Sequence, residues 1–343
     1  MAGCGADSAE GYGKEPKVFI VAQWNVQALF DGHETGREYR EYVEAAGWTA
    51  EKYQARIVAI SQAVLRMADP APALIGFTEI ESATALEDLA RGEISKHGYL
   101  WTAFANIPGA PLGLGILSRF PISDIRAHSI TIEAVTAPRP ILEVRIEPGG
   151  NPLVFLLCHW KSKLGGDAAT APQRRASARV VQRRLAELNG SGTPVIVMGD
   201  LNENHDEFYR HLGQVFCALL PDDPEAALLT GQSMPPDFLV LSGEKPPRAR
   251  AFAKGVHALY SPWDREKIGG SYYFRNRWET IDHFLLSESL FDGAGWEFAG
   301  SSVLNHAPFT GPDGTPNSYV PRTGRGLSDH LPLLLYLRDA GGD

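Results

Sequence analysis

Cysteine is scarce in this 343-residue sequence, and its three copies, Cys4, Cys158 and Cys217, lie far apart. Such spacing excludes a disulfide scaffold and a cysteine-based zinc ribbon. Long apolar runs are missing too, because none approaches the roughly 18 consecutive residues that a membrane-spanning helix requires. With 44% hydrophobic and 21% charged residues and no internal repeat, the composition is that of an ordinary globular protein.

Basic residues are in the minority. The chain has 32 Lys and Arg against 41 Asp and Glu, which gives a formal net charge of −9. An acidic total argues against affinity for nucleic acid or anionic membranes spread over the whole surface. It leaves room for one local basic cleft.

The first 16 residues, MAGCGADSAEGYGKEP, contain nothing that could pack into a core, and we expect a flexible N-terminal tail. Two interpretations of Cys4 are open. Ala2-Gly3-Cys4 followed by a polar tether resembles the end of a bacterial lipoprotein signal, whose cysteine carries a lipid anchor outside the cytoplasm. The basic and apolar regions that precede such a cysteine are missing, so Cys4 could equally belong to a plain tail. An extracytoplasmic location is slightly favoured over a cytoplasmic one.

From Lys17 onward, short apolar segments alternate with two helical patterns. Apolar spacing predicts a helix over residues 51–68, and a capping box at Thr170–Gln173 predicts the start of a second helix that runs to about Leu188. The predicted strands are 18–24, 73–78, 114–117, 141–146, 153–159, 195–198, 281–286 and 331–337. Because no linker divides these elements, we expect one α/β domain over residues 17–338.

Several of the predicted strands end in a carboxylate, an amide or an imidazole. The residues at these ends are Asn25, Glu79, His159, Asp200 with Asn202, Asp282, and Asp329 with His330. Strand ends hold side chains rigidly while the adjacent loops vary, so this pattern is typical of a catalytic rim. Carboxylates also suit a hard cation, which prefers oxygen ligands. Each motif alone has a plainer explanation, such as a turn, a surface charge or a helix cap.

Taken together, these segments resemble the endonuclease/exonuclease/phosphatase superfamily of metal-dependent phosphoesterases, which includes secreted DNases, abasic-site endonucleases, sphingomyelinases and inositol polyphosphate phosphatases. The matching segments follow the family's order: WNVQ (24–27), TEIE (78–81), GLGILSRFPI (113–122), LLCHWKSK (156–163), VIVMGDLNEN (195–204), ETIDHFLLS (279–287) and LSDHLPLLLYL (327–337). The resemblance implies a DNase I-like, four-layer α/β sandwich of two mixed β-sheets flanked by helices, with the site at one end. A looser resemblance, carried by Phe30-Asp31-Gly32, is to bacterial extracellular nucleases.

The resemblance also implies a metal site. Asn25, Glu79 and Asp329 would surround Mg²⁺ or Mn²⁺, which neutralises a phosphate oxygen and the charge that develops during attack. Abasic-site endonucleases have an aspartate where this chain has Gln27, and DNase-like members resemble this chain there. That difference indicates a subfamily rather than a loss of activity.

The remaining roles implied by the resemblance are catalytic. Asp200 would orient or deprotonate the attacking water, and Asn202 would hold a phosphate oxygen. His330, with its ring fixed by Asp282, would be a general acid/base or a phosphate contact. His159 would donate to the phosphate from the opposite wall. Which residue is the general base stays open.

Basic and aromatic residues near these motifs indicate how substrate would bind. Arg119, Lys161 and Lys163 are the candidates for phosphate contacts. Seven cations and one acid occur between Lys161 and Arg184, either as part of a basic rim or as a solvated helix face. Aromatic residues at 272, 273, 274 and 278 could stack on bases or line a lipid-facing groove, although a core position is favoured for Tyr273 and Phe274.

Three hypotheses about function follow. The first is a nuclease that hydrolyses DNA or RNA phosphodiester bonds, and it is favoured by the HWKSK segment, Gln27 and the basic residues. The second is a phosphatase or phosphodiesterase acting on inositol phosphates or phospholipid head groups. The third, less favoured because every implied catalytic position is occupied, is a degenerate surface binding protein. The sequence gives no indication of oligomeric state.

Overall fold

The computed structural model describes residues 18–132, 135–137, 139–211, 217–230, 236–263 and 269–341. The expected N-terminal tail, with Cys4, lies outside these residues. Among the described helices, none has both the length and the apolarity needed to cross a membrane.

Two large mixed sheets form the centre of the molecule. The first sheet has the order β17 (Trp296–Val303), β18 (Leu333–Asp339), β1 (Val18–Leu29), β2 (Leu74–Ile80), β4 (Gly113–Ser118) and β3 (Trp101–Ala105). The second has the order β11 (Leu219–Pro221), β12 (Leu239–Ser242), β13 (Ala258–Tyr260), β16 (Asp282–Leu286), β10 (Val195–Asp200), β9 (Leu153–His159), β8 (Ile141–Ile146) and β5 (Ile122–His128). Two hairpins complete the strands: β6 (Thr131–Ile132) with β7 (Val135–Thr136), and β14 (Tyr272–Phe274) with β15 (Arg277–Glu279).

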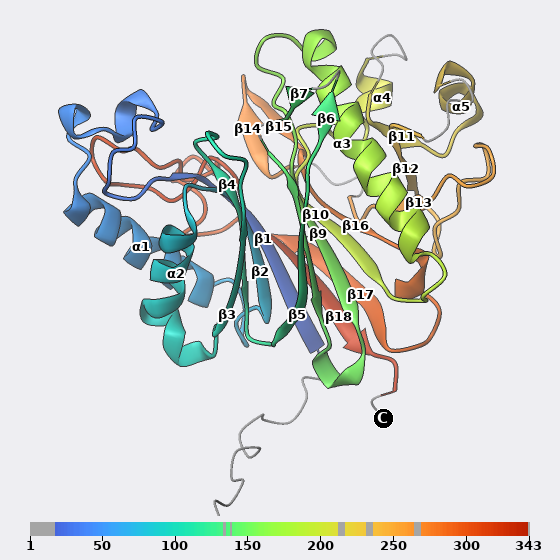
Figure 1. The fold of residues 1–343 in the computed structure, drawn as a ribbon, viewed down its shortest axis with the longest axis horizontal. Coiled ribbons are helices and arrows are strands. Elements are labelled where there is room, and N and C mark those ends of the chain that lie inside the picture. The colour runs from blue at the N-terminus through green and yellow to red at the C-terminus, as the bar shows by residue number, and fades with distance from the viewer. Residues whose placement is uncertain are drawn as a thin grey trace, which may run out of the picture.

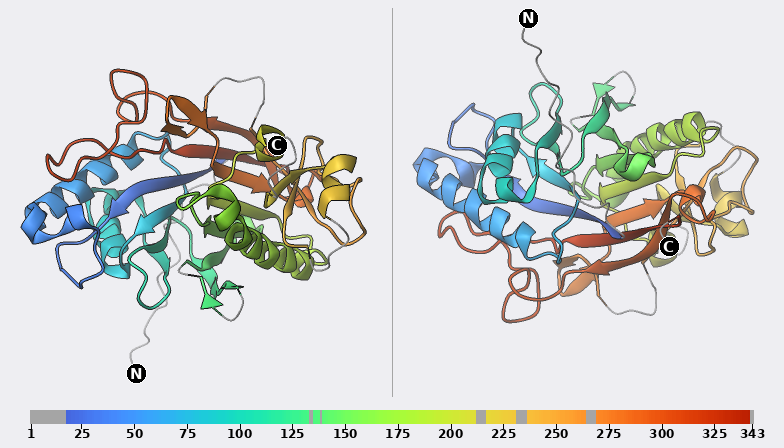
Figure 2. Two further views of the ribbon diagram at one scale, coloured as in Figure 1. Left: turned by 90° about the horizontal axis from the view of Figure 1, so that it is seen from above. Right: turned by 90° about the horizontal axis from the view of Figure 1, so that it is seen from below.

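Helices cover the outer faces of both sheets (Figures 1 and 2). They are α1 (Ala50–Leu65), α2 (Ala83–Arg91), α3 (Asp167–Leu188), α4 (Glu207–Arg210) and α5 (Pro224–Thr230). The first two lie on the first sheet, and α3 lies on the second. The predicted four-layer α/β sandwich is therefore confirmed.

Side-chain alternation along the strands separates an inner core from two outer ones. On β1, Phe19 and Val21 point between the sheets, where they meet Phe155 and Leu157 of β9. Ile20, the residue between the first two, points instead toward the helical layer of α1 and α2. Strands buried on both faces read as continuous apolar runs, which is why the sequence predicts them well.

The helices differ from the predicted ones in three ways, the first being that α1 ends at Leu65 rather than at residue 68. Thr170 does not cap α3, which begins three residues earlier; its hydroxyl donates to the carbonyl of Gly166 inside the first turn. The helix α2 was not predicted, although Ser82 caps it by accepting from the N–H of Ala85. Nine residues carry too short an apolar pattern to stand out in the sequence.

Candidate active site

The strand register of the second sheet places three polar side chains in one row. Asp200 pairs with His159 on β9 and with Asp282 on β16. All three continue the inner face of the sandwich, so the apolar layer between the sheets becomes polar at this end of the strands. Gly199, with φ +121°, allows the close approach of β10 to β9, because a Cβ there would lie 2.0 Å from the carbonyl oxygen of Cys158.

Glu79 joins the row only because the first sheet is irregular. Strict alternation would turn its side chain toward the helices with Phe77, but Glu79 has a φ of +69° and the register shifts there. On the neighbouring strand β1, Gln27 and Ala28 also have left-handed backbone conformations, and the Ala28 N–H donates to Glu79 Oε2 at 2.8 Å. Such backbone conformations cost about 1–3 kcal/mol each and cluster at functional sites.

Asn25 links the two sheets across the site. Its Nδ2 donates to Glu79 Oε1 at 3.2 Å and to Asp200 Oδ2 at 3.1 Å. His159 closes the same group, with Nε2 at 3.5 Å from Asp200 Oδ2 and 3.8 Å from Glu79 Oε1. Four strands, two from each sheet, thus meet around one pair of carboxylates.

His330 completes the group from the loop before β18. Its Nδ1 lies 2.7 Å from Asp282 Oδ2, an oxygen that also accepts from Ser271 Oγ at 2.6 Å. The Nε2 atom lies 3.9 Å from Asp200 Oδ2. The backbone of this loop is also fixed, because Trp24 Nε1 donates to the His330 carbonyl at 2.9 Å.

The environment gives the two histidines different protonation states. Burial alone would lower the pKa of His330, but Asp282, Asp329 and Asp200 raise it to about 10, so His330 is a cation at neutral pH. Burial, then the charges of Arg139 and His330, lower the pKa of His159 well below its usual value. The site therefore holds one imidazolium and one neutral imidazole.

The carboxylates of the site are short of positive charge. Burial and then Asp329 raise the pKa of Glu79, while burial and then Asp282 raise that of Asp200. Asp282 Oδ1 is buried and has no hydrogen-bond partner among the described residues. Oxygen atoms crowded in this way fit a hard divalent cation, and Glu79, Asp329 and Asn25 could hold it, although the Asn25 amide oxygen here accepts from the Gln27 N–H at 3.0 Å.

Asn202 lies beside the row. Its N–H donates to Asp200 Oδ1 at 2.9 Å, and its side-chain Nδ2 donates to the Trp160 carbonyl at 3.1 Å. Lys161 is near, with its ammonium directed to the carbonyls of Ser162 and Leu164. The structure therefore brings Asn202 and Lys161 to this end of the sandwich.

Two of the expected phosphate contacts are placed elsewhere. Arg119 follows β4, whose Ser118 pairs with Leu74 at the start of β2, and its guanidinium donates to the carbonyl of Ala71. It thus lies at the opposite end of the sheet from Glu79, and the expectation that it contacts substrate here is wrong. Lys163 is directed away from the row, with its ammonium 2.6 Å from Glu207 Oε1.

Arg139 belongs to the site and was not predicted. Its guanidinium donates to the Trp160 carbonyl at 3.2 Å, and its charge acts on Glu79, His159 and the Tyr39 hydroxyl. It lies in the segment before β8, which is far from every catalytic motif in the sequence. An Arg-Pro pair ahead of a strand is the only signal, and it is weak.

A second group of potential metal ligands lies beside α3. Ligand atoms of Asp167, Glu207 and His211 all lie within 4.8 Å of one another. Cations already neutralise this group, since Lys163 binds Glu207 and the guanidinium of Arg174 binds Asp167. Its negative charge is therefore balanced, unlike that of the group around Asp200.

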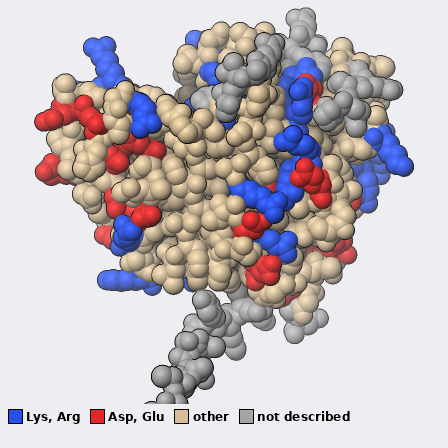
Figure 3. All heavy atoms as spheres, in the orientation of Figure 1, with Lys and Arg blue, Asp and Glu red and all other residues tan. Residues whose placement is uncertain are grey.

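The arginines of α3, which the sequence left as either a basic rim or a solvated helix face, are mostly ion-paired. Figure 3 shows acidic side chains among the basic ones on this side of the molecule. Arg174 is buried against Glu203, while Arg184 binds Glu143 at 2.7 Å. The arginines of this helix largely stabilise the fold.

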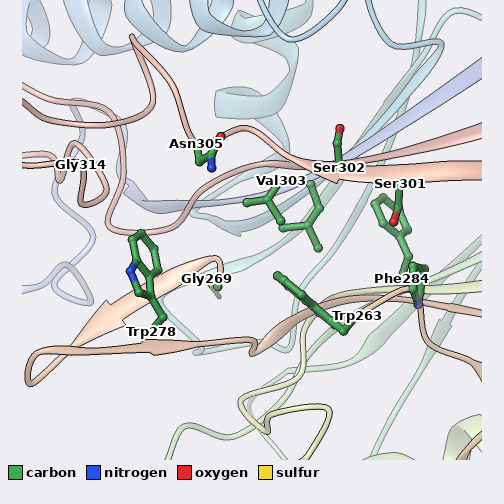
Figure 4. Close-up of a pocket in the computed structure, with 12 residues that line it drawn as sticks. Trp263, Gly269, Trp278, Phe284, Ser301, Ser302, Val303, Asn305 and Gly314 are labelled. Atoms are coloured by element: carbon green, nitrogen blue, oxygen red, sulfur yellow. The ribbon is translucent and has the colours of Figure 1, made fainter. Parts of the chain in front are cut away.

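The hairpin β14–β15 lies next to the loop that carries His330. On one of its faces, Tyr272 stacks on His330 with ring centroids 4.6 Å apart. On the other face, Trp278 lines a cavity of about 470 Å³ together with Trp263 and Phe284 (Figure 4). Phe274 at the tip is 49% exposed, so the expectation that it belongs to the core is wrong.

Comparison with known families identifies the chain. A family model described as "Endonuclease/Exonuclease/phosphatase family" matches residues 20–225. The chain belongs to this family. Its members are phosphoesterase hydrolases that typically depend on a divalent metal, which supports a hydrolase acting on phosphate esters here. Among curated proteins, none matches the sequence significantly.

Solved structures of this endonuclease/exonuclease/phosphatase family share the fold. Truncated TDP2 from Caenorhabditis elegans is 12% identical with a TM-score of 0.54, over 94% of this chain and 98% of that one. The human Nocturnin catalytic domain with bound sulfate is 15% identical with a TM-score of 0.54, over 95% and 96%. A family protein from Bacteroides thetaiotaomicron is 16% identical with a TM-score of 0.52, over 94% and 98%. These similarities confirm the predicted fold, as the family model confirms the predicted family.

Proposed function

We propose that the protein is a divalent-metal-dependent nuclease that hydrolyses phosphodiester bonds of DNA or RNA. The observation that carries this proposal is the buried group around Asp200, in which Asn25, His159 and His330 from three other segments surround one carboxylate. This group can place a water, a proton acceptor and charged donors around one phosphate.

Asp200 is the best-placed proton acceptor. Burial and the neighbouring Asp282 raise its pKa, and a carboxylate with a raised pKa is a stronger base than an exposed one. Its Oδ1 is fixed by the N–H of Asn202, which leaves Oδ2 facing the two histidines. Asp200 would therefore orient the attacking water and take its proton.

The two histidines would bind the phosphate from opposite sides. His330, held as a cation by Asp282, would donate a charge-assisted hydrogen bond from Nε2 to a phosphate oxygen. The neutral His159 would donate from the opposite wall. A divalent cation bound by Glu79, Asp329 and Asn25 would neutralise a further phosphate oxygen and the charge that develops during attack.

A polyanionic substrate is favoured by the cations on one side of this group. Burial, and then the charge of Arg139, lower the pKa of Lys161, so Arg139 and Lys161 lie close enough to repel each other. The charge of Arg139 also acts on His159. A chain of phosphates would relieve that repulsion. Nucleic acid offers phosphates on both sides of the scissile bond.

The test is a hydrolysis panel with Mg²⁺, Mn²⁺ or EDTA, using plasmid DNA, RNA, bis-p-nitrophenyl phosphate, p-nitrophenyl phosphate, inositol phosphates and sphingomyelin. His330→Ala is the inactive variant, and Leu100→Ala, which alters an exposed side chain next to β3, is the matched control. We expect metal-dependent cleavage of nucleic acid that is lost only in the His330 variant. Turnover of inositol phosphates or sphingomyelin with intact DNA and RNA would establish the phosphatase alternative, and no turnover at all would contradict both.

A further inference from the structure

The hairpin β14–β15 carries a stacked column of rings that leads from solvent to the catalytic histidine. Phe274 stacks on Tyr272 with centroids 6.0 Å apart and planes at 17°. Tyr272 in turn stacks on His330 at 4.6 Å and 28°. The ring of Phe274, the outermost of the three, is 49% exposed, whereas Phe284, in the core between the two sheets, is 1% exposed.

The column is held firmly in place. Tyr272 forms a β-bridge with His330, and the Leu331 N–H donates to the Ser271 carbonyl at 2.7 Å. Because side chains alternate along a strand, Tyr273 points to the other face, where it packs against Trp278 at 5.2 Å. One face of the hairpin is therefore anchored to the protein, and the other presents rings beside the catalytic group.

The tip of the hairpin adds positive charge. Arg275 lies with its guanidinium 5.1 Å from the Phe274 ring centroid, and Arg277 is exposed on the next strand. Neither arginine forms an ion pair with any residue that the structure describes, in contrast to most arginines of α3. Arg275 and Asn276 also occupy left-handed turn positions that favour glycine or asparagine, with φ of +47° and +62°.

We propose that this hairpin is a base-stacking arm, on which Phe274 receives an unpaired nucleobase next to the scissile phosphate while Arg275 and Arg277 bind the flanking phosphates. An exposed aromatic ring stacks on another flat ring, and the cations beside it attract an anion. A nucleotide unit of a single strand offers both an accessible base and a phosphate, and is therefore the ligand that fits the hairpin. An inositol phosphate would use only the cations. This inference rests on the proposed function and narrows its substrate to strands with accessible bases.

Binding without turnover tests the arm directly. Fluorescence anisotropy in EDTA would compare a labelled hexathymidylate with a hexamer of abasic sites, which has equal charge and no bases. We expect wild type to prefer the thymidylate, Phe274→Ala to reduce this preference about tenfold, and Phe274→Trp to restore it. Leu100→Ala is the control, because it removes another exposed apolar side chain outside the hairpin.

A kinetic measurement separates the arm from the nuclease activity. The p-nitrophenyl esters of thymidine 5′-phosphate and of 1,2-dideoxyribose 5′-phosphate share the same sugar and the same leaving group, so the ratio of their kcat/KM values reports the base alone. We expect Phe274→Ala to reduce this ratio about tenfold. Equal binding of thymidylate and abasic hexamers by wild type, or an unchanged preference in Phe274→Ala, would overturn the arm. Base-dependent binding without metal-dependent turnover would support the arm and overturn the nuclease.

Discussion

Two groups of carboxylates and histidine lie at one end of this protein, and they differ in what balances their charge. In the first, Asp200 and Asp282 face His330, and the pKa of Asp200 is raised. In the second, Asp167 and Glu207 face His211. Burial alone would raise the pKa of Glu207, but the Lys163 ammonium and the N–H of Asn204 lower it to about 2.

The contrast shows why residue types alone do not identify a metal site. The second group is a closed network in which Lys163 and Arg174 already supply the positive charge. Around the first group four carboxylates, those of Glu79, Asp200, Asp282 and Asp329, interact with one another, and the charges of His330 and Arg139 act on them. A divalent cation would stabilise the first group and would have to displace a lysine from the second.

The largest difference should be in catalysis. Asp200→Asn removes the proposed base and should reduce kcat/KM about 10³-fold, and Asp329→Ala and His330→Ala should have comparable effects. Glu207→Gln should leave kcat/KM within about threefold, because Glu207 contacts only the supporting network. Initial rates on bis-p-nitrophenyl phosphate with Mg²⁺ would measure both. Near-wild-type activity of any of the first three variants would mean that its role is misassigned.

Glu207→Gln, which should hardly affect catalysis, should clearly affect stability. Because the pKa of Glu207 is lowered from 4.5 to about 2, its charge stabilises the fold by about 3 kcal/mol above pH 4.5, and this contribution is lost as the pH falls through 2. Glu207→Gln should therefore reduce the free energy of unfolding at pH 7 and have little effect near pH 2. Urea unfolding of both proteins across this range would show a pH-independent difference if the interpretation is wrong.

Metal binding should distinguish the two groups next. A cation present at about 100 times its Kd stabilises the folded state by about 2.7 kcal/mol. We expect Mn²⁺ to raise the Tm of wild type and of Asp167→Asn, and not of Glu79→Gln. Thermal unfolding with and without Mn²⁺ measures this. Loss of the shift in Asp167→Asn instead would assign the cation to the second group.

A smaller effect is expected from Arg139. Arg139→Gln should reduce kcat/KM on nucleic acid about tenfold, because one phosphate contact is lost. The same change should raise the pKa of His159, since the nearby positive charge is removed. NMR titration of the imidazole resonances would detect that rise, and an unchanged pKa would place Arg139 outside the site.

The smallest effect should be a gain in stability. A carboxyl whose pKa is raised by folding destabilises the protein at any pH at which it is ionised, so Asp200→Asn should stabilise the metal-free protein at pH 8. The gain should disappear below about pH 4, where the carboxyl is protonated in both the folded and unfolded states. A lower Tm of Asp200→Asn at pH 8 would show that the charge is compensated.

Sequence patterns predicted the layers of this fold and most residues that gather at the site. Strands buried on both faces leave continuous apolar runs, and a polar residue at the end of each run marks the common end of the strands. The same reasoning failed for Arg119, because a motif match does not say which end of an antiparallel strand a residue occupies. It also failed for Phe274, whose exposure depends on a hairpin that no periodicity in a three-residue strand could reveal.

By itself, the sequence determined the family, the inner apolar layer and the chemical types of the site residues, since all of these are written in local order and alternation. Only the tertiary structure decided which charges meet. It turned Glu79 inward through a left-handed backbone conformation, brought Arg139 to His159, and paired Lys163 with Glu207. These contacts join residues distant along the chain, and their electrostatic effect depends on burial and on distances of a few ångströms, which no local pattern encodes.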